Sequence, residues 1–201
     1  MLVLLQSLNG IACCRINRLA DRAPDFGTAT FEVLVSSKPS IRFIRHERSH
    51  SRFVAKPGPE HAFSEKRFEE VLQFFGPNEL ASAMTDVTPV VFEKILGWQS
   101  AGEGSSADIE LRVVIEEYCL SAFDGLSDVD IDCRISAELV DTGNNELVWR
   151  DCMEWRSEKI GVSVYDLSHM PQEDIKQFVV SVSESLANWL AQRITADMEK
   201  N

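Results

Sequence analysis

A strict alternation of apolar and charged residues dominates the middle of the chain. It divides into three runs, residues 108–120, 128–140 and 146–155. A period of two gives a β-strand one apolar and one polar face, as in an antiparallel sheet that is covered on one side. The Gly- and Asn-containing segment 141–145 supplies a turn between the second and third runs. The pattern therefore predicts three consecutive antiparallel strands.

One residue breaks the pattern in the third run. Leu147, Trp149, Met153 and Trp155 share an apolar side, and Asp151 interrupts it. A charged residue at such a position is typical of a β-bulge or of a strand near the sheet edge.

The flanking segments predict further elements. Residues 28–35 and 41–46 have strand character, and so does the apolar run 90–98, VVFEKILGW. A helix is expected at 64–75, because Ser64 can cap it and Gly76-Pro77 can end it. A second helical segment is expected at 78–84.

The last predicted helix begins at Pro171, since Pro is favoured at the first helical position. The apolar residues that follow recur at helical spacing in one broad stripe: Ile175, Phe178, Val179, Val182, Leu186, Trp189, Leu190 and Ile194. This helix of ~20 residues is expected to lie across the sheet and to close the core.

Together these elements predict a single α+β domain over residues 28–201. Its sheet is mainly antiparallel, and helices at 64–84 and 171–196 pack on one face. Residues 1–27 are interpreted as a signal- or lipobox-like segment followed by a polar linker at 15–24. Residues 156–167 stay ambiguous, with a further edge strand as one interpretation.

Charge limits the classes of partner. The 201-residue chain has a formal net charge of −12, which argues against nucleic acid because phosphates need a basic surface. Residues 1–62 carry nine Lys and Arg against five Asp and Glu, whereas residues 103–141 carry two against eleven. The acidic region is explained by a solvated sheet face, and the basic region could face an anionic surface.

The five cysteines are Cys13, Cys14, Cys119, Cys133 and Cys152. An odd number gives no closed disulfide framework. Cys133 lies on an apolar strand face, so we expect an inert core residue. A pair between Cys119 and Cys152 is geometrically possible but not required by the pattern.

The sequence predicts no catalytic residue, no cofactor and no metal site. It contains no GxSxG, HExxH or Walker lysine motif. A calcium site at Asp124, Asp128, Asp130 and Asp132 is disfavoured, because the loop glycine is missing and strand alternation explains the spacing. A thiol enzyme built on Cys152 has no local support, and a structural role is preferred.

The first twelve residues, MLVLLQSLNGIA, form an apolar run that ends at Cys13. The run is too short to span a membrane, but it has the length of the apolar region of a signal peptide. Small residues before Cys13 resemble the cleavage box of bacterial lipoproteins, although Gly10 stands where an aliphatic residue is usual. Cys13, and less favourably Cys14, is the predicted lipidation site. The alternative is a buried N-terminal strand or helix with a chance pair of cysteines.

The order of elements resembles the ABC-type transport auxiliary lipoprotein family, which includes PqiC-like proteins. The resemblance spans residues 28–194 and rests on pattern. Its parts are the segment from Arg52-Phe53 to Pro57, the run VFEKILGW, the strand 107–115, the hairpin 135–149 and the amphipathic C-terminal helix. The hairpin is its strongest part.

The resemblance implies a non-enzymatic lipoprotein that is tethered to the outer membrane and faces the periplasm. It would assist an ABC-type lipid transport system, or envelope assembly, through protein–protein contacts. Cys13 would carry the acyl chains. Two alternative functions stay open. The first is a binding or adaptor protein or a secreted effector without a lipid anchor, and its location would be soluble, secreted or cytoplasmic. The second is an enzyme of unrecognised type.

Four aromatic residues are candidates for contact with a partner. Trp149, Trp155, Phe178 and Trp189 are expected mostly in the core, where aromatic residues commonly lie. Some of them could line an apolar groove between the last helix and the sheet, which would suit a lipid, an acyl chain or a partner peptide.

Overall fold

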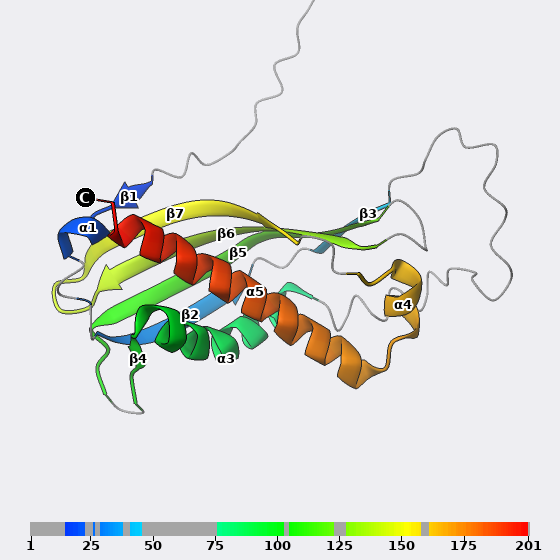
Figure 1. The fold of residues 1–201 in the computed structure, drawn as a ribbon, viewed down its shortest axis with the longest axis horizontal. Coiled ribbons are helices and arrows are strands. Elements are labelled where there is room, and N and C mark those ends of the chain that lie inside the picture. Colours follow the sequence, from blue (N-terminus) through cyan, green and yellow to red (C-terminus); the bar gives the residue numbers. More distant parts are fainter. Residues whose placement is uncertain are drawn as a thin grey trace, which may run out of the picture.

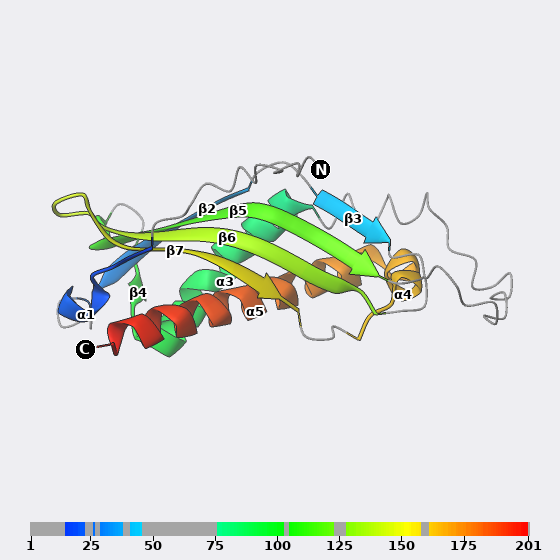
Figure 2. The same cartoon turned by 90° about the horizontal axis from the view of Figure 1, so that it is seen from above.

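The computed structural model describes residues 15–22, 26, 29–37, 41–45, 76–102, 105–122, 128–157 and 161–200. Its strands are β1 (Ile16–Asn17), β2 (Thr30–Ser37), β3 (Ile41–Arg45), β4 (Gln99–Ser100), β5 (Ile109–Ala122), β6 (Asp130–Asp141) and β7 (Glu146–Arg156). Its helices are α1 (Leu19–Arg22), α3 (Pro77–Leu96), α4 (Val164–His169) and α5 (Gln172–Met198). The strands form one seven-stranded sheet, and α3 and α5 cover one of its faces (Figure 1, Figure 2). The predicted α+β class is therefore confirmed.

The three central strands agree with the alternation of the sequence. β5 pairs with β6, and β6 with β7, both antiparallel. The register is irregular between Ile115 and Glu117 and between Leu139 and Val140, as at a β-bulge. Asn145, with φ 56°, lies in the turn that was expected between β6 and β7.

The remaining sheet edge is parallel, which the sequence pattern did not indicate. The strand order is β1-β7-β6-β5-β2-β4. β2 and β3 both run parallel to β5 along the same edge, and β4 runs parallel to β2. Parallel neighbours need a crossover connection, and α3 lies between β2 and β5 in the chain. The sheet is therefore mixed, antiparallel from the edge strand β1 to β5 and parallel beyond β5.

The strand predicted at residues 90–98 was wrong, because α3 continues to Leu96. Val90, Val91 and Ile95 have strand propensity, yet the buried residues Met84 and Thr88 precede Phe92 at intervals of four. Packing of this helical face on the sheet outweighs propensity. The helix also continues through Pro89 and ends at Gly97 in a left-handed conformation (φ 73°). The helix expected at 64–75 lies outside the described residues.

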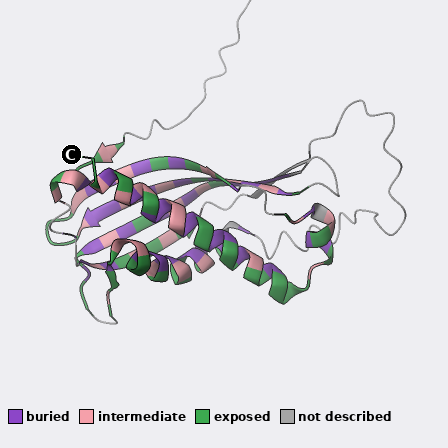
Figure 3. Ribbon diagram, in the orientation of Figure 1, coloured by how far each residue is buried: buried purple, intermediate pink, exposed green. Residues whose placement is uncertain are grey.

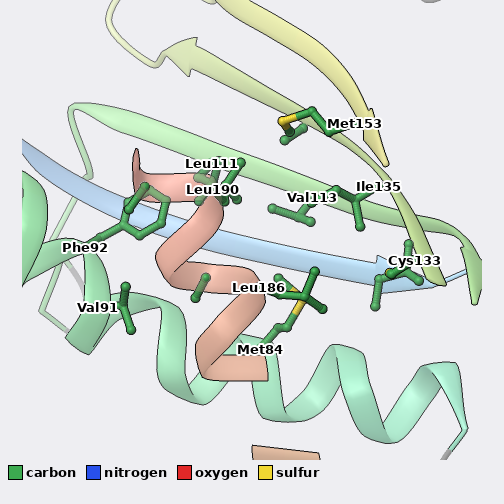
Figure 4. Close-up of a cluster of buried hydrophobic side chains, with 14 of the residues drawn as sticks. Met84, Val91, Phe92, Leu111, Val113, Cys133, Ile135, Met153, Leu186 and Leu190 are labelled. Carbon is green, nitrogen blue, oxygen red and sulfur yellow. The ribbon is translucent and has the colours of Figure 1, made fainter. Parts of the chain in front are cut away.

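Helix α5 is the predicted C-terminal helix. Its apolar stripe is buried, with Leu186, Leu190 and Ile194 each 0% exposed. Figure 3 shows buried positions alternating along the strands and along the sheet-facing side of α5. In Figure 4 side chains of α3, α5 and the central strands meet in one core: Met84, Phe92, Leu111, Val113, Ile135, Met153, Leu186 and Leu190. Each fully buried Leu stabilises the fold by roughly 1.5–3 kcal/mol.

In the described part of residues 156–167, the edge strand that was considered is reduced to one antiparallel bridge between Ser163 and Asp128. β7 ends at Arg156, and α4 begins after Ser163. A capping box starts this helix, since Ser163 Oγ accepts from the Asp166 N–H (3.0 Å) and Asp166 Oδ2 accepts from the Ser163 N–H (3.1 Å). The side-chain hydrogen bond from Ser163 lowers the pKa of Asp166. Local capping therefore outweighs the alternating pattern here.

The polar linker expected at residues 15–24 was also wrong, because β1 and α1 belong to the fold. β1 pairs antiparallel with β7. Leu19 of α1 is 0% exposed, and Arg22 Nη2 lies 2.5 Å from Asp141 Oδ2. The buried Leu19 and the ion pairs of Arg15 and Arg22 therefore hold this polar segment on the fold.

Candidate functional site

The described chain begins at a group of polar side chains where β1, β7 and the C-terminal end of α5 meet (Figure 1). We call this group the N-terminal junction. It consists of Arg15, Asn17, Trp149, Asp151, Arg193, Asp197 and Lys200. It brings the first described residue into contact with a helix that begins more than 150 positions later in the sequence.

Asp197 is the centre of the junction, and its side chain is 0% exposed. Arg15 Nη2 donates to both carboxylate oxygens, at 2.6 and 2.5 Å. The Trp149 indole Nε1 donates at 2.9 Å and Lys200 Nζ at 2.7 Å. Burial alone would raise the pKa of Asp197, but the hydrogen bonds from Lys200, Trp149 and Arg15 lower it to about 2. The buried carboxylate is therefore charged and satisfied at neutral pH.

Asp151 is the second carboxylate of the junction, and it explains the break in the apolar side of β7. Its side chain is 9% exposed on the helix-covered face. Arg193 of α5 donates to Asp151 Oδ2 from Nε (3.1 Å) and Nη2 (3.0 Å). Arg15 Nε lies 3.7 Å from the same oxygen. Arg15 thus bridges one carboxylate on the sheet and one on the helix.

This arrangement fixes the chain at the residue that lies two positions after Cys13. Buried charges are costly unless each is paired, so the two carboxylates and the four side chains that pair with them, Arg15, Trp149, Arg193 and Lys200, must be positioned together. The hydrogen bonds and ion pairs of the junction hold the N-terminal end of the fold against β7 and α5. Cys13 itself lies outside the described residues.

The sequence indicated the junction only indirectly. Asp151 breaks an apolar strand face, and Asp197 follows Leu190 and Ile194 at helical spacing on the apolar stripe of α5. Two acidic residues on two core-facing surfaces are a signal of paired burial. Their partner Arg15 carried no such signal, because the segment around it is polar throughout.

The four aromatic candidates lie on two elements, Trp149 and Trp155 on β7 and Phe178 and Trp189 on α5. Trp149 is 0% exposed, and its indole N–H donates a hydrogen bond to Asp197. Trp155, Phe178 and Trp189 are partly buried and pack against the core. Other aromatic rings meet at α3, where the ring centroid of Phe92 lies 5.6 Å from that of Phe31.

A hollow of about 410 Å³ is found on the outer side of the sheet, where β5, β6 and β7 run side by side. It is lined by Glu117, Cys119, Asp132, Cys133, Arg134, Glu154, Trp155 and Arg156. Its charged residues pair across the strands: Arg134 lies 4.0 Å from Glu117 and 3.9 Å from Glu154. The three carboxylates and two arginines of the lining leave the hollow weakly acidic, as on a solvated sheet face.

The described cysteines differ in chemistry. Burial raises the pKa of Cys133 to about 12, so this core residue stays a thiol. Cys119 is also a thiol and contacts the Leu120 carbonyl oxygen at 3.7 Å. Cys152 is exposed and disulfide-bonded. The pair between Cys119 and Cys152 is therefore not formed, and Cys152 offers no thiolate nucleophile in this state.

Two further searches cover only the described ranges. In them no group of three or more His, Cys, Asp or Glu residues is placed to hold a metal ion. No helix in the same ranges is both long and apolar enough to cross a membrane. Asp124 of the disfavoured calcium site lies outside these ranges.

No family model matches the chain, and no curated protein does. Among solved structures, the chain is similar to protein XCC0632 from Xanthomonas campestris, described as DUF330. The identity is 12%, the match covers 86% of this chain and 90% of that one, and the TM-score is 0.44. It is similar to lipoprotein GNA1162 from Neisseria meningitidis at 18% identity, 80% and 99% coverage and a TM-score of 0.27. It is also similar to the PelC dodecamer from Paraburkholderia phytofirmans at 9% identity, 79% and 88% coverage and a TM-score of 0.35. At this level of likeness, function has to be argued from the chain's own residues.

Proposed function

We propose that this chain is a non-enzymatic lipoprotein of the cell envelope, acylated at Cys13 and held at the periplasmic face of the outer membrane. The observation that carries the proposal is the position of Arg15. This residue follows Cys13 by two positions and is fixed by Asp197 and Asp151 to the edge of the sheet. Acyl chains on Cys13 would thus hold the fold at the membrane surface, since two or more chains anchor a protein without a spanning helix.

The disulfide at Cys152 supports export from the cytoplasm. Disulfides form and persist in oxidising compartments such as the periplasm, and they are rare where thiol reductants are abundant. The apolar run MLVLLQSLNGIA before Cys13 supports the same route, because it has the length of a signal-peptide core.

Within the envelope, we propose that the protein assists an ABC-type lipid transport system, or envelope assembly, through protein–protein contacts. The resemblance of the hairpin 135–149 to the auxiliary lipoprotein family supports this role. A lipid or acyl chain is a possible additional ligand.

Acylation and location can be tested with three versions of the full chain: wild type, Cys13→Ser and the control Cys119→Ser. Cells are fed an alkyne-tagged fatty acid and then separated into soluble, inner-membrane and outer-membrane fractions. We expect wild type and Cys119→Ser to carry the tag and to fractionate with the outer membrane. Cys13→Ser is expected to lose the tag and to leave that fraction.

Two other outcomes would overturn the proposal. If wild type is untagged and stays soluble, the alternative of a soluble binding protein or secreted effector without an anchor is favoured. If purified wild type turns over substrates in a broad hydrolase panel, and loses this activity when its thiols are alkylated, the chain is an enzyme.

A further inference from the structure

One end of the molecule carries a group of five basic side chains. Helix α1, strand β1, the turn between β6 and β7 and the C-terminal end of α5 lie at this end, whereas α4 and the start of α5 lie at the opposite end (Figure 1, Figure 2). We call the first of the two the basic end. Its basic residues are Arg15, Arg18, Arg22, Arg193 and Lys200. They come from both ends of the described chain, so the fold brings them together.

In the ion pairs of this end, the cation is the more exposed partner. The side chains of Lys200 and Arg15 are 57% and 41% exposed, whereas that of Asp197, which pairs with both, is 0% exposed. Arg18 is 58% exposed, against 36% for its partner Glu146. A pair placed in this way presents its positive side to the solvent.

Few exposed carboxylates offset these cations. Within the described residues 15–22 and 193–200, the exposed carboxylates are those of Asp21 and Glu199. The basic end therefore presents a positive surface, although the whole chain has a formal net charge of −12. Charges more than about 8 Å away are largely screened at physiological salt, so a surface that touches this end meets the local charge.

We propose that the basic end contacts the anionic headgroups of the membrane, so that α4 and the start of α5 lie farthest from the bilayer. This choice of partner rests on the proposed function, since acyl chains on Cys13 would lie two positions before Arg15 in the sequence. Guanidinium groups match the geometry of phosphate oxygens. Each Lys or Arg near an anionic membrane strengthens binding by about fivefold. A basic surface is also a known second signal beside a lipid anchor.

The first test measures vesicle binding without a lipid anchor. The full chain with Cys13→Ser is sedimented with vesicles of phosphatidylcholine alone or of phosphatidylcholine and phosphatidylglycerol in equal amounts. We expect binding to the mixed vesicles only, and weaker binding as salt is added. Arg18→Glu in the same chain should weaken this binding at least about fivefold. Far-UV circular dichroism checks that the variant is folded.

The matched control is Lys176→Glu. Lys176 is 56% exposed and pairs with Glu173 three positions earlier on α5, as Lys200 pairs with Asp197. The two lysines are separated by about 36 Å along the helix, several times the screening length. The reversal at Lys176 should therefore leave vesicle binding unchanged.

The same two lysines provide a second test on acylated wild type. The protein is placed in either kind of vesicle and treated with an amine-reactive acetylating reagent, and the modified lysines are quantified by mass spectrometry. We expect Lys200 to react more slowly than Lys176 on mixed vesicles. On phosphatidylcholine vesicles this difference should disappear.

The outcomes separate this inference from acylation. Failure of Cys13→Ser to bind mixed vesicles, with equal reactivity of the two lysines in wild type, would reject the basic end and leave acylation open. Protection of Lys200 without such binding would support a contact that needs the acyl chains. Equal weakening by Arg18→Glu and Lys176→Glu, or equal binding to both kinds of vesicle, would reject the proposal. Wild type that carries no fatty-acid tag would reject the lipid anchor, while binding of mixed vesicles through Arg18 would still support the basic end.

Discussion

Two regions of the sheet pair arginines with carboxylates that differ in burial. At the N-terminal junction, the side chains of Asp197 and Asp151 are 0% and 9% exposed. On the outer face, Glu117 and Glu154 around Arg134 are 56% and 82% exposed. Buried pairs are costly to break because an uncompensated charge is left behind, whereas exposed pairs contribute little. The comparison indicates that the pairs around Asp197 and Asp151 contribute to the stability of the fold, whereas the exposed pairs around Arg134 contribute little.

The largest effect at the junction is expected from Asp197→Ala. This substitution leaves the Arg15 guanidinium and the Trp149 indole without their shared acceptor. The Trp149 indole stays buried, but the Arg15 side chain is 41% exposed and can still be hydrated, so we expect a loss of about 2–3 kcal/mol of unfolding free energy rather than the larger cost of breaking a fully buried pair. Urea unfolding followed by far-UV circular dichroism measures it. A loss of unfolding free energy below about 1 kcal/mol would show that the junction contributes no more to stability than the outer face does.

Removal of the disulfide by Cys152→Ser is expected to cost about 2–4 kcal/mol, because the bond restricts the unfolded chain. The measurement is urea unfolding of oxidised protein, with Cys119→Ser as the control that leaves the bond intact. Addition of a reductant should lower the stability of wild type to that of Cys152→Ser and should leave the variant unchanged. Equal stability of all samples would show that the bond contributes nothing.

The junction also predicts a pH dependence. The pKa of Asp197 is about 2 in the fold, below the value of about 3.9 for an unfolded Asp. The unfolded chain therefore binds the proton first, and the stabilisation is present above about pH 4 and lost as the pH falls toward 2. Wild type should lose stability more steeply between pH 5 and 2 than Asp197→Asn, which has no carboxyl group to titrate. If the stability of both proteins falls equally with pH, the acid sensitivity comes from other carboxylates.

A smaller effect is expected from Arg193→Ala. This variant removes the two hydrogen bonds to Asp151, but Arg15 stays 3.7 Å from the same carboxylate. Loss of one partner of a buried group costs about 1–3 kcal/mol. Chemical unfolding should place this variant between wild type and Asp197→Ala. Combining Arg193→Ala with Asp197→Ala should give less than the sum, since both act on the pairing of Arg15.

The sequence predicted the parts of the fold that local pattern determines. β5, β6 and β7 alternate strictly, and α5 carries a continuous apolar stripe, so both were found close to their observed bounds. The segment 90–98 was assigned to a strand because its β-branched residues concealed the spacing of buried positions in α3. The parallel pairing of β2 with β5 follows from a crossover between distant segments, which no local pattern encodes.

The junction could not be predicted from the sequence either, because it joins residues from distant segments of the chain. Asp151 was noticed as an exception on β7, but its partners come from opposite ends of the chain. Burial of Asp197 depends on Arg15, Trp149 and Lys200 arriving together, and each of these has an unremarkable sequence context. Charged residues on core-facing positions are the only local trace of such a cluster.

The smallest effect is expected from Arg134→Ala on the outer face. Arg134 lies 4.0 Å from Glu117 and 3.9 Å from Glu154, and all three side chains are at least 46% exposed. Exposed pairs at such distances are screened by water and salt, so the free energy of unfolding should change by no more than about 0.5 kcal/mol. Urea unfolding at low and at high salt measures the change, with Arg193→Ala as the buried counterpart. A loss as large as that of Arg193→Ala would show that exposure does not separate the two regions, and the outer face would then be part of what holds the sheet together.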